Sequence, residues 1–262
     1  EGDGDYIIVE GNRLTGLPAS ATKGNPPGQP ATNRTESLSL SLTDTDLAGG
    51  DFVSQLFFNR SRDTFGGDPT PIATFQDPAI APVGTLFDQS QNRSRKLGGK
   101  FTYERAVPGF EALTATVGFD ALFDKTEQRL IATGRTWVPP TDFRSLAPFT
   151  QLNLALFDET LRLAGGLRHE MARIKVEDYT TLAAYGSRFV EGGAPKFSDT
   201  LFNGGVIVEP VEGIRAYVSY AEGYTVPDVG RITRAVSAEG VRIDDFLDIS
   251  PIVSNNREVG FE

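Results

Sequence analysis

Apolar and polar residues alternate strictly along several short stretches of this chain. Between residues 37 and 43, Leu38, Leu40 and Leu42 fall on one side, and serines and a threonine fall on the other. Successive side chains of a β-strand point to opposite faces, so a period of two predicts strands with one apolar and one polar face. No stretch shows the apolar period of an amphipathic helix.

The same criterion predicts about ten strands. They are expected at residues 6–10, 37–43, 52–60, 96–105, 113–123, 149–157, 161–170, 202–209 and 214–220, and from Asn255 onward. Tight turns rich in glycine and proline separate several neighbours, such as Pro210–Gly213 between two alternating runs. Such punctuation between two strands is typical of a β-hairpin.

Long irregular connections alternate with these short turns. The long connections are expected at residues 12–33, 61–93, 124–147, 171–198 and 222–254. Consecutive strands can then be antiparallel neighbours, with every short turn at one end of the sheet and every long loop at the other. Because outer-membrane barrels show this contrast, the sequence predicts an all-β antiparallel meander forming part of a transmembrane barrel.

Composition narrows the functions that are open to the chain. It has 262 residues with a formal net charge of −10, no cysteine and one histidine. The acidic balance disfavours nucleic acid, whose phosphates require clustered Lys and Arg. Without Cys, and with only His169, thiol catalysis and multi-histidine metal sites are disfavoured. No apolar run is long enough for a transmembrane helix, although barrel strands do not produce such runs.

One late segment carries a specific motif. Residues 217–224 read Tyr-Val-Ser-Tyr-Ala-Glu-Gly-Tyr, followed by Pro227-Asp228, and residues 256–260 read Asn-Arg-Glu-Val-Gly. This combination resembles the late barrel strands of TonB-dependent outer-membrane receptors. Residues 124–128, 137–140, 147–151 and 165–170 resemble further landmarks of that family. The resemblance covers about residues 36 to 262.

The resemblance implies a location, a function and partners. It implies a bacterial outer-membrane receptor that takes up a ferric siderophore or a similar metal chelate. Its partners would be outer-membrane lipid and the TonB energy-coupling complex, reached through a plug domain. The plug is missing from residues 1–262, and complete outer-membrane transporters have about 22 strands, so we expect part of one barrel domain. Neither a cofactor nor catalysis is implied, and the chain is not expected to be an enzyme.

Candidate ligand-binding residues are the aromatic and arginine side chains expected on the long-loop side. A bulky anionic ferric chelate suits aromatic surfaces and guanidinium groups, which offer stacking, cation–π and bidentate contacts. The candidates are Arg135, Trp137, Arg144, Tyr179, Tyr185, Arg188, Tyr224, Arg231 and Arg234. The alternative for the same residues is packing within the loops or an interfacial aromatic girdle.

Two other groups admit a metal interpretation. His169 ends a predicted strand and is interpreted as a packing residue, with a metal or haem ligand as the alternative. Asp244, Asp245 and Asp248 supply the carboxylates that Ca²⁺ prefers, but they lack the full spacing of an EF-hand. A solvated loop is the preferred interpretation, and no metal site is predicted.

An alternative reading remains for the chain as a whole. Arg162, Arg168 and Glu170 share one face, which we interpret as lumen-facing ion pairs in preference to acid–base catalysis. The alternative is a soluble β-rich binding module of the carbohydrate-binding sandwich type. Such a module must bury its leucine-rich faces against a second sheet, and it would be soluble without detergent.

Overall fold

The computed structural model describes residues 2–4, 6–9, 14–16, 18, 20–23, 30–65, 71–226, 228–246 and 252–262. The long strands are β4 (Ala31–Leu47), β5 (Gly50–Thr64), β6 (Ser90–Val107), β7 (Phe110–Leu130), β8 (Thr136–Leu156), β9 (Leu161–Val176), β12 (Lys196–Val211), β13 (Ile214–Thr225) and β14 (Ile252–Phe261). The shorter elements are β1 (Gly2–Gly4), β2 (Tyr6–Val9), β3 (Ser20–Lys23), β10 (Tyr179–Thr180), β11 (Phe189–Val190), the 3₁₀ turns η1 (Ala73–Phe75) and η2 (Ala183–Tyr185), and the helices α1 (Val229–Thr233) and α2 (Ile243–Phe246).

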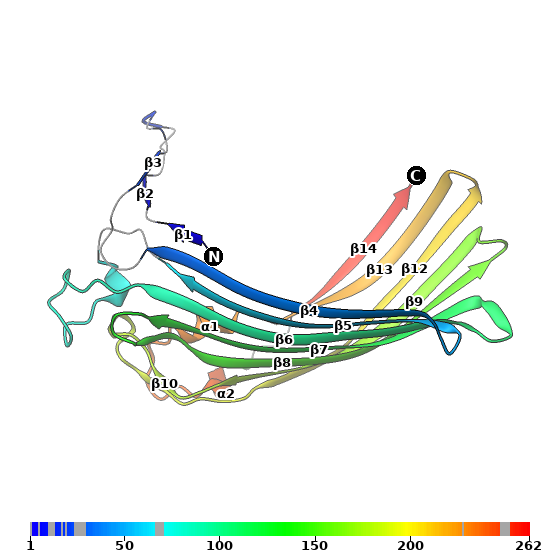
Figure 1. Cartoon of the computed structure of the whole chain (residues 1–262). Helices are drawn as coiled ribbons and strands as arrows, with labels where there is room; N and C mark the ends of the chain where they lie inside the picture. Colours follow the sequence, from blue (N-terminus) through cyan, green and yellow to red (C-terminus); the bar gives the residue numbers. More distant parts are fainter. Residues whose placement is uncertain are drawn as a thin grey trace.

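Ten strands form one curved antiparallel sheet, in the order β1-β4-β5-β6-β7-β8-β9-β12-β13-β14 (Figure 1). From β4 onward, each strand pairs with the next long strand along the chain, so the sheet is a meander. The pairs β2-β3 and β10-β11 stand apart from it. The sheet does not close, and β14 ends it on one side. The predicted all-β antiparallel meander is confirmed.

Strand register collects the apolar side chains on the outer, convex face. Leu38 lies opposite Phe58, Phe58 opposite Leu97, and Leu97 opposite Phe123, so one apolar row crosses four strands. We call this outer set the apolar belt; it includes Leu38, Leu40, Leu42, Leu56, Phe58, Leu97, Phe101, Val117, Phe123, Leu146, Leu152, Leu167, Met171, Phe202, Val218 and Val259. Leu38 is 71% exposed and Leu40 68% exposed.

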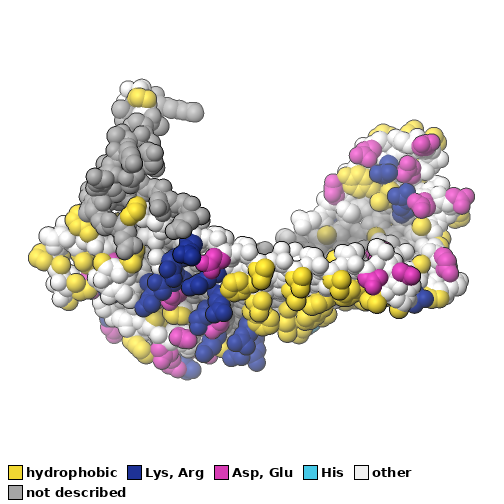
Figure 2. Space-filling view, viewed as in Figure 1, with side chains coloured by type: hydrophobic (Ala, Val, Ile, Leu, Met, Phe, Trp, Pro, Cys, Tyr) yellow, Lys and Arg dark blue, Asp and Glu magenta, His cyan; other side chains and the backbone are white. Residues whose placement is uncertain are grey.

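Figure 2 shows the apolar belt as a continuous surface along the middle of the sheet. Exposed apolar patches of this extent mark a surface that contacts lipid or a partner. The sandwich alternative requires a second sheet over these leucines, and the described residues form no such sheet. That alternative is therefore not favoured.

Glycines on the inner face make room for rings from neighbouring strands. Gly98 lies opposite Phe57, and Gly118 lies opposite Phe149. A Cβ atom built on Gly98 would lie 2.2 Å from Phe57 Cζ, and one on Gly118 would lie 2.1 Å from Phe149 Cζ. Each ring thus covers the backbone of its neighbour, an arrangement that pins the register of strongly curved sheets.

The two ends of the sheet differ as the loop lengths indicate. The turns that join β4 to β5, β6 to β7, β8 to β9 and β12 to β13 all lie at one end, and the long connections lie at the other (Figure 1). The predicted loop at residues 124–147 is wrong, because β7 continues to Leu130 and β8 begins at Thr136. The β7 extension is almost entirely polar on both faces, and the β8 extension has apolar residues without a period of two, so hydropathy gave no alternation there.

The long connections pack into a layer with its own apolar interior. One cluster contains Ile174, Val176, Tyr179, Val190, Val229, Val236 and Ile243. A second contains Phe75, Leu130 and Leu182, with Trp137 and Tyr185 packed against it. Within the described residues, no helix is both long and apolar enough to cross a membrane. The two apolar clusters make the loop layer an ordered platform that covers one end of the sheet.

Candidate functional site

A polar groove lies at the loop end, between the inner face of the sheet and α1. Its volume is about 360 Å³. The sheet contributes Ser61, Asp63, Asn92, Arg93, Ser94, Thr126, Glu127, Gln128 and Val138, and the segment around α1 contributes Asp228, Gly230, Arg231 and Arg234. In Figure 1, α1 lies behind the sheet, on the side away from the apolar belt.

Local contacts hold α1 against the sheet. Asp228 caps the helix, because its Oδ1 accepts a hydrogen bond of 3.2 Å from the Arg231 backbone N–H. Gly230 allows a close approach, since a Cβ atom there would lie 3.3 Å from Val138 Cγ1. Thr233 is fully buried, and its hydroxyl donates to the Val229 carbonyl at 2.9 Å.

The segment around α1 gives the groove two guanidinium groups, and the sheet adds Arg93, which lies 3.4 Å from Glu127. Arg231 is exposed and forms no ion pair among the described residues. The Arg234 guanidinium lies over the Trp137 ring, 5.0 Å from its centroid. The opposite wall offers amides and hydroxyls, together with the carboxylate of Asp63, which accepts a hydrogen bond from Asn33. The groove can therefore bind an oxygen-rich anionic ligand without any covalent step.

Trp137 connects the groove to the apolar cluster beneath it. Its ring packs edge-on against Phe75, with centroids 4.8 Å apart and an interplanar angle of 78°. The indole Nε1 is buried and has no hydrogen-bond partner among the described residues. The ring is thus fixed between Phe75 and Arg234, and it orients the guanidinium.

Arg135 has a structural role in the loop layer. Its Nη2 donates to the Phe75 carbonyl at 2.6 Å and lies 3.4 Å from the fully buried carboxylate of Asp88. Its Nε donates to Thr133 Oγ1 at 2.9 Å. These contacts clamp the segment before β6 onto the turn between β7 and β8. A guanidinium with so many partners is committed to packing.

Three further candidates also serve the loop layer. Tyr179 is buried, and its hydroxyl donates to the Thr233 carbonyl at 2.7 Å. Burial raises the pKa of Tyr179. Arg188 donates to the Ser237 carbonyl at 3.2 Å and pairs with Glu239, and Tyr185 packs on the cluster around Phe75. These residues fit the packing alternative.

Two candidates lie away from the groove. Arg144 does not belong to a loop, because it is an exposed residue of β8 opposite Phe123 and Arg173, on the outer face. Its expected place beside the other candidates is corrected accordingly. The Tyr224 hydroxyl, at the loop end of β13, is buried and has no hydrogen-bond partner among the described residues.

The residues considered for metal binding have other contacts. His169 Nδ1 lies 2.9 Å from Thr200 Oγ1 on the adjacent strand. Asp244 Oδ1 accepts a hydrogen bond of 2.7 Å from the Ala194 N–H, and Asp248 lies outside the described residues. No group of three or more His, Cys, Asp or Glu side chains suited to a metal ion occurs in the described part of the chain.

The predicted lumenal ion pairs are present. Arg168 lies 2.6 Å from Asp120 Oδ2 and also pairs with Glu170. Its guanidinium lies 5.6 Å from the centroid of the Phe149 ring. Arg162 pairs instead with Glu159 at the turn before β9, at 3.0 Å. A guanidinium held between two carboxylates supports the inner wall and leaves no free acid–base pair.

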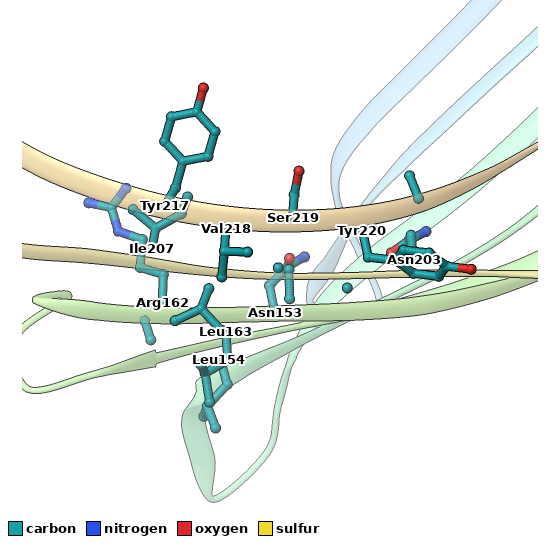
Figure 3. A pocket seen from close by; sticks show the side chains of 16 residues that line it. Asn153, Leu154, Arg162, Leu163, Asn203, Ile207, Tyr217, Val218, Ser219 and Tyr220 are labelled. Atoms are coloured by element: carbon teal, nitrogen blue, oxygen red, sulfur yellow. The ribbon is translucent and has the colours of Figure 1, made fainter. Parts of the chain in front are cut away.

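A larger hollow, of about 550 Å³, lies along the wall across β8, β9, β12 and β13 (Figure 3). Its lining consists of consecutive residues, so side chains of both faces contribute. In Figure 3, Tyr217 and Ser219 point to one side of their strand and Val218 to the other. The hollow therefore follows the curvature of the wall and gathers no convergent polar groups.

Sequence reasoning missed the sheet half of the polar groove. Asp63, Asn92 and Gln128 lie in strand extensions that had been assigned to loops. The available signal was weak, because their outward neighbours are also polar. Only the pairing of β5, β6 and β7 places them side by side.

The fold defines a class of protein, namely a wall segment of an antiparallel β-barrel. Residues 2–262 match the family described as TonB dependent receptor-like, beta-barrel, and the chain belongs to that family. It is 24% identical to the ferric aerobactin receptor of Klebsiella pneumoniae over 301 aligned residues, covering 94% of this chain and 39% of the relative. The ferric aerobactin receptor of Escherichia coli gives the same identity and coverage.

Two solved structures share the fold. The copper transporter OprC matches with a TM-score of 0.65 at 17% identity, over 88% of this chain and 36% of that protein. The ferric yersiniabactin uptake receptor FyuA from Yersinia pestis matches with a TM-score of 0.60 at 17% identity, over 94% of this chain and 36% of that protein. The chain thus spans well under half the length of these relatives, which are receptors and transporters.

Proposed function

We propose that this chain forms part of the barrel wall of an outer-membrane receptor that takes up a ferric siderophore or a similar metal chelate. The observation that carries the proposal is the polar groove with the two guanidinium groups on its α1 side, located at the loop end of the sheet of a family member. The matched relatives named as ferric aerobactin and ferric yersiniabactin receptors support this ligand class.

The membrane placement rests on the apolar belt. Outward-facing leucines, valines and phenylalanines suit the lipid of an outer membrane, and the inner face carries polar side chains. A lipid-facing apolar band with a wet interior is the pattern of outer-membrane barrels. The long loops then lie on the side from which ligand arrives.

Ligand capture is assigned chiefly to Arg231 and Arg234. A ferric chelate with carboxylate or phenolate oxygens would accept hydrogen bonds from both guanidinium groups. Trp137 positions Arg234. Arg135, Tyr179, Tyr185 and Arg188 are assigned to the scaffold of the loop layer.

Transport requires parts beyond this wall. The large sheet has ten strands, whereas complete transporters have about 22 around a plugged lumen. We propose that residues 1–262 supply only part of the barrel domain. The TonB energy-coupling complex would act through a plug carried elsewhere in the parent receptor.

The test uses the full-length parent receptor in cells that lack other ferric-chelate receptors. Uptake of iron-55 aerobactin and binding to cells without energy coupling are measured for the wild type and Arg231→Ala/Arg234→Ala. Loss of two charge-assisted contacts should weaken binding about tenfold or more. The matched control is Arg242→Ala, an exposed loop arginine whose only ion pairs in the described structure are with Glu191 and Asp245.

Three outcomes are informative. Weakened binding in the double variant, with normal binding in the control, supports the groove as the capture site. Unchanged affinity in the double variant removes the groove from the ligand site. Absence of uptake by the wild type for aerobactin and for other ferric chelates would refute the proposed ligand class.

A further inference from the structure

Polar side chains form straight rows across the inner face of the sheet at the loop end. The hydroxyl row has one member on each strand from β4 to β8, namely Thr35, Ser61, Ser94, Thr126 and Thr141. The amide row lies two residues nearer the loops and contains Asn33, Asp63, Asn92 and Gln128. Both rows contribute to the polar groove. Strand pairing therefore lines up hydroxyl and amide groups on the wall that faces α1.

Four members of these rows have no side-chain hydrogen bond in the described part of the chain, although they are half-buried. They are Ser61, Asn92, Thr126 and Gln128. Polar groups at such positions are normally paired with protein, water or a ligand. All four line the groove. The sheet wall of the groove thus presents open hydrogen-bonding groups to whatever occupies the space.

The next inner row toward the turns is closed by its own contacts. The Asn59 side chain donates to Ser37 Oγ at 2.8 Å, and Lys96 Nζ lies 3.4 Å from Asp124 Oδ2. Strand register places these four residues side by side on β4, β5, β6 and β7. None of them lines the groove. The change from closed to open groups therefore coincides with the edge of the groove.

The open stretch is bounded on both sides. Toward β4, the Asp63 carboxylate accepts a hydrogen bond from Asn33. Toward β8, Gln128 lies opposite Val138, an apolar residue close to Gly230 of the segment that carries α1. The open side chains therefore belong to β5, β6 and β7. Neighbouring strands are about 4.8 Å apart, so the stretch is about 10 Å wide.

The two walls of the groove suit different parts of a ligand. Hydroxyl and amide side chains carry both donors and acceptors without a charge, so they match neutral amide or hydroxyl groups. The charged groups on the sheet wall are already engaged, because Arg93 lies 3.4 Å from Glu127 and Asp63 accepts an amide hydrogen bond. Arg231 and Arg234, on the α1 side, remain for an anion.

We propose that the groove binds its ligand in two parts, with a neutral arm rich in amide or hydroxyl groups on the sheet wall and an anionic end on the α1 side. This inference rests on the proposed function, and it narrows the ligand class to anionic ferric chelates with a hydrophilic arm about 10 Å long. Asn92 and Gln128 become specificity-determining residues. A chelate without the arm leaves their polar groups unpaired, and unpaired polar groups are a strong source of discrimination.

The experiment measures binding to cells that carry the full-length parent receptor without energy coupling. One probe is the iron-55 complex of a citrate dihydroxamate with free carboxylates and amide arms. The other is the methyl ester of the same chelate, which keeps the arms and loses those charges. Affinity is taken from the midpoint of each binding curve, because a smaller amount of folded receptor lowers only the plateau.

Three variants are compared with the wild type. Asn92→Ala/Gln128→Ala removes the open amides, and Arg231→Ala/Arg234→Ala removes the guanidinium groups. Asn153→Ala/Asn203→Ala is the matched control, because it removes two inner-face amides that lie outside the groove.

Asn92→Ala/Gln128→Ala should weaken the binding of both probes about tenfold and by the same factor, because the lost contacts are neutral. Arg231→Ala/Arg234→Ala should weaken the free acid more than the ester, because only the acid has carboxylates to pair with the guanidinium groups. The control should match the wild type for both probes.

Several results would overturn the inference alone. They are unchanged affinity in Asn92→Ala/Gln128→Ala, a loss confined to the free acid, an equal loss in the control, and no binding of the ester by the wild type. Binding of ferric chelates that lack such an arm, without binding of the acid probe, would also overturn it and leave the proposed function standing. A wild type that binds no ferric chelate refutes the proposed function and the inference together.

Discussion

Arg234 stacks on Trp137, with its guanidinium carbon 5.0 Å from the centre of the indole ring. Trp137 belongs to β8, and Arg234 follows α1 almost a hundred residues later in the chain. The contact therefore joins the sheet to the loop that forms the other wall of the groove. It fixes a long, flexible cationic side chain beside that groove.

The first prediction tests this contact. Trp137→Leu removes the aromatic face and should reduce ferric-chelate affinity about three- to tenfold, because an exposed or partly buried cation–π contact contributes about 0.5 to 2 kcal/mol. Trp137→Phe keeps a smaller ring and should lose less. Affinity is measured by binding of iron-55 chelate to cells that carry the full-length receptor.

A double-mutant cycle is the control for this prediction. If Trp137 acts by holding Arg234, then Trp137→Leu should have little further effect in an Arg234→Ala background. Independent, additive losses would show that Trp137 affects binding by another route, such as loss of packing on Phe75.

The second prediction concerns the clamp between Arg135 and Asp88. Asp88 is fully buried, and it also accepts hydrogen bonds from the Ala132 N–H at 2.8 Å and the Thr133 hydroxyl at 2.6 Å. Asp88→Asn leaves Arg135 with Asp77, 3.5 Å away, as its remaining counter-charge, so the loss should stay below the value of about 3 to 5 kcal/mol for a buried charge left without any partner. Hydrogen exchange should rise sharply in the segment before β6 and hardly at all in β5 to β9.

The exposed pair of Arg242 and Glu191 provides the comparison for the clamp. Its side chains are 54% and 55% exposed, and such pairs contribute little to stability. Glu191→Gln should therefore leave exchange almost unchanged. If Asp88→Asn behaved in the same way, the clamp would not hold the loop layer.

The apolar belt could be predicted from the sequence, whereas most of the groove could not. The strand with Leu38, Leu40 and Leu42 was predicted from its alternation, because lipid requires an apolar outer face and the lumen requires a polar inner face. Beyond the belt that contrast ends, so the strand extensions around Lys125 and Arg144 carried no periodic signal. Pairing with neighbours, and not local hydropathy, keeps those residues in strands.

The groove needed tertiary information for the same reason. Arg231 and Arg234 were found by residue type, and the structure places both beside the inner face of the sheet. Arg135 matched the same criterion, but its guanidinium is engaged in contacts with Asp88 and the Phe75 carbonyl. A composition rule cannot separate a free guanidinium from a buried clamp, because the difference lies in a distant segment.

The third prediction concerns pH and the loop layer. Burial raises the pKa of Tyr179, whose hydroxyl donates to the Thr233 carbonyl. Because the folded pKa is above the unfolded value, the stabilisation is complete below the ordinary tyrosine value of about 10 and is lost as pH rises toward the raised value. Hydrogen exchange in α1 should therefore accelerate, relative to base-catalysed exchange in β7, as pH increases above that range.

Tyr179→Phe isolates the titrating group in this experiment. The variant leaves the Thr233 carbonyl without its donor, so the local stability of α1 should fall by about 1 kcal/mol. Hydrogen exchange in α1 should then be faster at neutral pH. Its additional pH-dependent loosening should disappear. If the variant loosens with pH as the wild type does, another group controls the loop layer.

The last prediction concerns the ring-over-glycine contacts of the inner wall. In Gly118→Ala, the new Cβ atom would lie 2.1 Å from Phe149 Cζ and 2.8 Å from the Phe101 carbonyl oxygen, so the Phe149 ring must move. Overpacking of this kind costs about 1 to 3 kcal/mol. Gly165→Ala in the neighbouring part of the sheet is the matched control, because its Cβ atom would meet nothing nearer than 4.0 Å. Urea unfolding of the full-length receptor in detergent should show a lower midpoint for Gly118→Ala and little change for Gly165→Ala.

Gly118→Ala/Phe149→Leu should recover part of the loss, since the smaller side chain leaves room for the methyl group. Equal midpoints for the two single variants would show that the ring yields without cost, and the contact would then contribute nothing to the register of β7 and β8.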